Sequence, residues 1–80
     1  MAFTEQRYFK LRNDLQSIIG DVQNKKLGTE EAKGMSVGTL HQIEDIEKEL
    51  GLTVREQETE WLNNLRRLHR QLVQTIQEAQ

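Results

Sequence analysis

The apolar side chains of this chain recur every three or four positions, which is the pitch of an α-helix. No segment alternates strictly between apolar and polar residues, as a half-buried β-strand would. Among the 80 residues there is no proline, the residue that interrupts helices most strongly. The sequence therefore predicts an all-α protein, and three segments carry the helical spacing.

The first segment predicts a helix over about residues 5–27. Thr4 is the expected N-cap, because its hydroxyl can accept a hydrogen bond from a free amide of the first turn. Lys25 and Lys26 would lie in the last turn, and Gly28 would end the helix. The apolar stripe of this helix consists of Tyr8, Leu11, Leu15, Ile18, Ile19 and Val22.

The second segment predicts a helix over about residues 30–50, with Thr29 as its N-cap. Gly34 and Gly38 oppose this prediction, since each costs roughly 1 kcal/mol relative to alanine within a helix. Both fall on the side opposite the apolar stripe, so a continuous helix would lose no packing. A loop through 28–38 followed by a shorter helix is the alternative, and the long helix is slightly favoured. The stripe consists of Ala32, Ser36, Leu40, Ile43, Ile46 and Leu50.

The third segment has the clearest pattern and predicts a helix over about residues 54–79. Gly51 would end the second helix, and Thr53 and Glu56 have the three-residue spacing of a capping box. The stripe consists of Val54, Trp61, Leu65, Leu68, Leu72 and Ile76, widened by Leu62 and Val73.

Short connections make consecutive helices antiparallel, so we expect one domain over 1–80, a small up-down-up three-helix bundle. Apolar residues make up 35% of the chain, which is a low share for a globular monomer. Phe3 and Phe9 also point away from the stripe of the first helix. This surplus favours assembly as a homodimer or burial against a partner. The alternative is that Phe9 is the edge of a wide apolar arc.

The charge balance excludes some functional classes. With 11 basic and 13 acidic residues the formal net charge is -2, which gives no global attraction to nucleic acid or to anionic membranes. No apolar run approaches the ~20 residues of a membrane span, and the N-terminus lacks the basic-then-apolar order of a signal peptide. Without cysteine there is neither a disulfide nor a thiolate metal site. We expect a soluble cytoplasmic protein.

Arg66, Arg67 and Arg70 form the densest basic cluster and fan across the solvent side of the third helix. Such a face can follow phosphates or receive an acidic partner. Glutamates one to three turns earlier shorten its positive field, since the Debye length is about 8 Å at physiological salt. No aromatic residue shares the face to stack on a base. We therefore expect a solvated or protein-contacting face, with nucleic-acid binding as the alternative.

The histidines suggest no metal or catalytic site. His69 lies within the apolar arc of the third helix, where a boundary residue with a hydrogen-bond partner is the usual role. His41, Glu44 and Asp45 have the spacing of metal ligands, but ordinary surface pairs explain them better. No nucleophile, base and orienting group can be recognised, and a small bundle has little room for a pocket of even ~300 Å³. We expect no enzyme activity, no cofactor and no small-molecule substrate.

The sequence thus favours a non-enzymatic protein–protein interaction module that packs helix against helix, such as a small adaptor, regulator, inhibitor or assembly factor. Trp61 is expected to anchor the bundle core, with a hot spot at an interface as the alternative. Two other functions stay open: a nucleic-acid-binding regulator that uses the arginine face, and a structural subunit of a larger assembly. The predicted contact residues are Phe9, Trp61, Leu65, Leu68, Leu72, Ile76, Arg66, Arg67 and Arg70.

Overall fold

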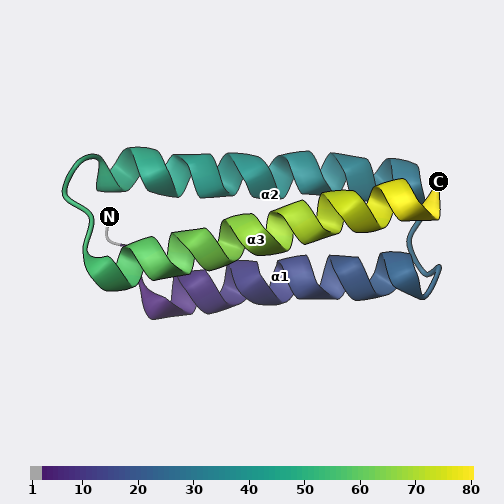
Figure 1. The fold of residues 1–80 in the computed structure, drawn as a ribbon, viewed down its shortest axis with the longest axis horizontal. Helices are drawn as coiled ribbons and strands as arrows, with labels where there is room; N and C mark the ends of the chain where they lie inside the picture. The colour runs from purple at the N-terminus through teal and green to yellow at the C-terminus, as the bar shows by residue number, and fades with distance from the viewer. Residues whose placement is uncertain (1–2) are drawn as a thin grey trace.

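A computed structural model describes residues 3–80 and contains three helices, α1 (Glu5–Gln23), α2 (Thr29–Leu50) and α3 (Glu56–Ala79) (Figure 1). Consecutive helices run antiparallel, and the molecule is a rod of 39 × 17 × 17 Å. The start of α1 and the α2–α3 connection lie at one end, and the C-terminus and the α1–α2 connection lie at the other (Figure 1). The predicted all-α, antiparallel three-helix bundle is confirmed.

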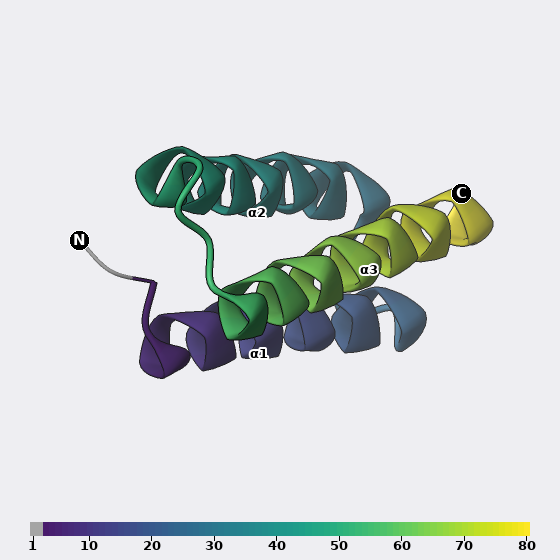
Figure 2. The ribbon, with the colours of Figure 1, turned by 60° about the vertical axis from the view of Figure 1, so that its left-hand side comes forward.

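Helix α3 is the element on which the other two helices pack. It contacts both α1 and α2, whereas α1 and α2 contact each other much less. Figure 2 shows α3 running between them, so its predicted stripe faces two neighbours at once. The most deeply buried large side chains come from all three helices and are Leu15, Ile43, Ile46, Leu65 and Leu72.

The start of α1 agrees with the sequence, but its end does not. Thr4 is the N-cap, and its Oγ1 accepts a hydrogen bond from the Arg7 N–H at 3.2 Å. The helix ends at Gln23 and not near residue 27, because Lys25 adopts a left-handed backbone with φ 60°. The Lys26 N–H then bonds back to the Asp21 carbonyl at 2.8 Å, which closes a Schellman turn without glycine.

Helix α2 is continuous through Gly34 and Gly38, so the alternative with a loop over 28–38 is wrong. A Cβ added at either glycine would meet no atom within 4 Å, which places both on open surface. The expected cap at Thr29 is also wrong, since Gly28 is the N-cap and makes no side-chain hydrogen bond. The predicted end at Gly51 is confirmed, with φ +59°.

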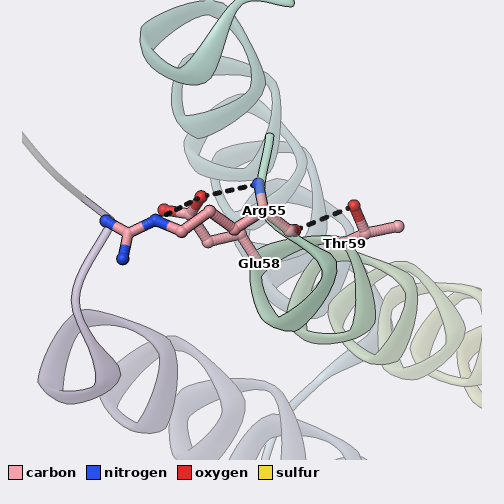
Figure 3. Close-up of polar contacts among 3 residues, drawn as sticks. All are labelled: Arg55, Glu58 and Thr59. Carbon is pink, nitrogen blue, oxygen red and sulfur yellow. Dashed lines mark hydrogen bonds and ion pairs between the residues drawn. The ribbon is translucent and has the colours of Figure 1, made fainter. Parts of the chain in front are cut away.

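Helix α3 begins at Glu56, two residues later than predicted, and Arg55 is its N-cap. The carboxylate that reaches back to the cap is therefore that of Glu58, which accepts the Arg55 N–H at 3.0 Å (Figure 3). The capping box predicted at Thr53 and Glu56 is wrong. Glu58 lies on the buried side of α3 and Glu56 on the exposed side, so packing selects the later carboxylate. Val54 lies outside the helix and is 39% exposed.

Among residues 3–80, no helix has the length and apolarity needed to cross a membrane.

Candidate interaction surface

All four aromatic side chains of the chain gather where α1 and α3 begin. The Tyr8 and Trp61 rings stack with centroids 5.3 Å apart and an interplanar angle of 11°. Phe3 meets Trp61 edge-on, with centroids 5.4 Å apart. The cluster joins the two helices, and it makes Trp61 a half-buried part of the bundle's own packing.

Phe3 is buried, with only 4% of its surface exposed, so the expectation that it contributes surplus apolar surface is wrong. It precedes α1, and the chain there is not helical. The angular spacing of a helix therefore says nothing about the direction of its side chain. Phe9, by contrast, lies within α1 and stays 38% exposed, as its position on the helix predicts.

The exposed ring of Phe9 is covered on one side by a cation from its own helix. The Arg12 guanidinium carbon lies 4.6 Å from the centroid of the Phe9 ring and 5.9 Å from that of Tyr8. At this distance the positive charge is attracted to the electron-rich ring face. Phe9 and Arg12 therefore present an apolar ring and a fixed positive charge side by side.

Two hydrogen bonds connect the aromatic cluster to Arg67 through the side chain of Asn64. Asn64 Nδ2 donates to the Tyr8 hydroxyl at 2.5 Å, and Asn64 Oδ1 accepts a hydrogen bond from Arg67. A surface hollow of about 370 Å³ on α3 adjoins Asn64 and Arg67. Its lining residues are Glu60, Asn63, Asn64 and Arg67. We refer to Phe9, Arg12, Trp61, Asn64 and Arg67 together as the aromatic flank.

The three arginines of the predicted basic face do not act alike. Arg66 forms an ion pair with Glu47 of α2, with Nε 3.2 Å from Oε2. Arg67 instead donates to the side-chain oxygen of Asn64, one turn earlier on its own helix. Arg70 is exposed on the helix between them and belongs to no ion pair among residues 3–80. In the described part of the chain, Arg66 alone of the three arginines makes a polar contact with a neighbouring helix.

The aliphatic residues of the predicted contact set lie inside the bundle. Leu65 and Leu72 are fully buried, Ile76 is 3% exposed and Leu68 is 9% exposed. In the folded chain these side chains pack in the core that α3 forms with α1 and α2. Of the predicted contact residues, only the following keep substantial exposure: Phe9, Trp61, Arg66, Arg67 and Arg70.

The histidines occupy ordinary positions. His69 Nε2 lies 3.0 Å from the carbonyl oxygen of Ser36 on α2, so the predicted boundary residue with a hydrogen-bond partner is confirmed. His41, Glu44 and Asp45 are exposed. The part of the chain that the structure describes contains no group of three or more histidine, aspartate or glutamate side chains placed to hold a metal ion.

The expectation that such a bundle lacks room for a pocket of ~300 Å³ is wrong. One open surface hollow measures about 540 Å³ and lies between the α1–α2 connection and the end of α3. Another, of about 460 Å³, lies between α1 and α2. Helices are cylinders that meet along lines, so grooves form between them even when the core is fully packed.

Sequence reasoning missed Arg12 and Asn64. Arg12 stands three residues after Phe9 and four after Tyr8, which is the spacing of neighbours on one helix surface, so this contact could have been inferred. Asn64 and Tyr8 lie on different helices and are 56 positions apart in the chain, and no local pattern indicates such a pair.

No protein-family model, curated protein or solved structure matches the chain.

Proposed function

We propose that the chain is a non-enzymatic protein–protein interaction module that binds its partner through the aromatic flank. The observation that carries the proposal is the Arg12 guanidinium held 4.6 Å above the half-exposed Phe9 ring. Aromatic and arginine side chains are the types most enriched at the centres of protein interfaces. A cytoplasmic location stays a prediction from the sequence.

Binding would follow from the chemistry of the flank. A partner helix laid across the start of α1 and α3 would remove the exposed part of the Phe9 ring from water. Arg12 and Arg67 would favour acidic side chains on that helix and disfavour basic ones. The Phe9 ring already packs on Tyr8, and Tyr8 stacks on Trp61. Little side-chain freedom would therefore be lost on binding.

The alternative of a nucleic-acid-binding regulator is less well supported. Arg66 is paired with Glu47, which leaves Arg67 and Arg70 as the cations of the face. Few phosphate contacts give weak binding that added salt removes readily. Titration of a labelled oligonucleotide at low salt, with an Arg66, Arg67 and Arg70 triple variant as comparison, would decide between the two functions.

The proposal is tested by quantitative affinity capture from the native host with tagged wild-type chain and with Phe9→Ser. We expect a captured protein that is depleted about tenfold or more by Phe9→Ser, the size expected for an interface hot spot. Glu44→Gln is the control, since Glu44 is exposed on α2. Equal capture by wild type, Phe9→Ser and Arg67→Glu, with all variants folded, would contradict the proposal.

A further inference from the structure

The seam between α1 and α2 is the least closely packed of the three. Two hollows, of about 460 and 190 Å³, lie along it, and all residues that line them come from these two helices. We call the pair of hollows the α1–α2 groove. Its lining includes Leu11, Asp14, Ile18 and Asp21 on α1, and Met35 and Gly38 on α2.

The floor of the groove is apolar and its rim is low. Leu11, Ile18 and Ile46 are core residues whose outer edges line the hollows. Met35 stands on the rim and is 46% exposed. Gly38 has no side chain to raise the rim, and a Cβ built there meets no atom within 4 Å. The groove can therefore accept side chains of another helix.

The rim carries unpaired negative charge. Asp14 and Asp21 line the larger hollow, and neither belongs to an ion pair among residues 3–80. In the smaller hollow, Arg7 is already neutralised by Glu49, whose Oε2 lies 2.7 Å from Arg7 Nη1. Asp45 there faces the same hollow as Lys10. The larger hollow therefore carries two negative charges, those of Asp14 and Asp21, that no ion pair within residues 3–80 neutralises.

From this geometry we propose that the α1–α2 groove binds a cationic amphipathic helix of a second protein. The apolar side chains of that helix would cover Ile18 and Met35, and its lysines or arginines would meet Asp14 and Asp21. Asp14 and Asp21 are seven positions apart, so cations about two helical turns apart, roughly 10.5 Å, match them. This site lies between α1 and α2, and it does not depend on the aromatic flank, which lies between α1 and α3.

A second copy of the chain is a poorer occupant. The basic face of this chain is on α3, around Arg70. The large apolar side chains that are exposed among residues 3–80 are Phe9, Met35, Val37, Leu52 and Val54. None of them lies within α3, so the basic face brings charge to the groove but no large exposed apolar side chain. Phe9, which lies beside a cation, already has the Arg12 guanidinium over its ring.

The test uses a fluorescein-labelled helical peptide of leucine, alanine and lysine, about 18 residues long so that it spans ~27 Å. Its counterpart with glutamate in place of lysine is the control peptide. We expect anisotropy titration at low salt to show binding of the lysine peptide alone. The double variant Asp14→Lys, Asp21→Lys should weaken it by about tenfold or more, since two attractive contacts become repulsive. Glu44→Lys with Glu78→Lys makes the same change of net charge away from the groove and should bind about twofold less tightly at most.

Two glycine variants distinguish a blocked groove from an unfolded protein as the cause of lost peptide binding. Gly38→Leu places a side chain in the groove, whereas Gly34→Leu adds the same side chain at a position that does not line it. Both should raise the melting temperature, because leucine is a better helix former than glycine. Only Gly38→Leu should reduce peptide binding, by about tenfold.

Three results would overturn the proposal: equal binding of the two peptides, equal binding by Gly38→Leu and Gly34→Leu, or self-association that Gly38→Leu abolishes. The last would make a second copy the occupant. Phe9→Ser should leave peptide binding unchanged, so that a failure of this proposal is distinguishable from a failure of the proposed function.

Discussion

The backbone N–H of Arg55 donates to the Glu58 carboxylate at 3.0 Å, and this hydrogen bond fixes the first turn of α3. Glu58 is 6% exposed, although glutamate is rarely buried without a partner. The Arg55 Nε lies 3.7 Å from the same carboxylate oxygen (Figure 3). One residue therefore offers both a backbone donor and a cation to the buried charge.

We expect Glu58→Ala to lower the free energy of unfolding by about 1–2 kcal/mol, because the cap amide loses its acceptor. Thr53→Ala is the control. It removes the cap that the sequence suggested, yet Thr53 is exposed and should change stability by less than ~0.5 kcal/mol. Urea unfolding of both variants measures the difference. Equal losses would place the start of α3 at Thr53.

The number and order of the helices could be predicted from the sequence, but not all of their ends. Apolar spacing repeats over five or more turns and survives local exceptions such as Gly34 and Gly38. A helix end depends on one or two residues. The spacing of a capping box occurs at Thr53 with Glu56 and again at Arg55 with Glu58, and only burial of the second carboxylate distinguishes them.

Lys25→Gly should stabilise the protein by about 0.5–1 kcal/mol. Lys25 holds φ 60°, a backbone conformation that costs an ordinary residue roughly 1–2 kcal/mol and costs glycine almost nothing. Thermal unfolding should show a melting temperature several degrees higher. Lys26→Gly, at a residue with no positive φ, should instead lower the melting temperature, and a rise in both variants would contradict the Schellman turn.

Gly34→Ala should stabilise α2 by roughly 1 kcal/mol, since the glycine is helical and its Cβ position is open. Gly51→Ala should act in the opposite direction, because φ +59° at the end of α2 favours glycine. Denaturant midpoints of the two variants test both signs. A loss of stability in Gly34→Ala would indicate that α2 is interrupted near this residue.

Leu72→Asp should abolish folding. Leu72 is fully buried, and the aspartate would be a charge without a partner in the core. Gln74→Asp is the control, because Gln74 is exposed on the same helix. Circular dichroism should show loss of helix in the first variant and a native spectrum in the second, and an unchanged melt of Leu72→Asp would refute its place in the core.

The candidate surface was only partly predictable, and the reason is geometric. Phe9 and the arginines were inferred because a helical wheel separates exposed from buried positions. The wheel cannot say whether an apolar stripe is covered by its own chain, which is the case for Leu65 and Leu72. It also cannot say which partner an exposed arginine finds: Arg66 bonds to Glu47 on α2, whereas Arg67 bonds to Asn64 on its own helix.

The hydrogen bond between Asn64 and Tyr8 should contribute measurably to the junction of α1 and α3. Tyr8→Phe removes the acceptor but keeps the ring stacked on Trp61, and Asn64→Ala removes the donor. In a double-mutant cycle we expect a coupling free energy of about 0.5–1.5 kcal/mol, the usual net value of one hydrogen bond. Asn63 lies on the exposed side of α3, so Asn63→Ala with Tyr8→Phe is a matched cycle that should show additivity within ~0.5 kcal/mol. If both cycles are additive, Asn64 does not connect the arginines to the aromatic cluster, and the aromatic flank reduces to Phe9, Arg12 and Trp61.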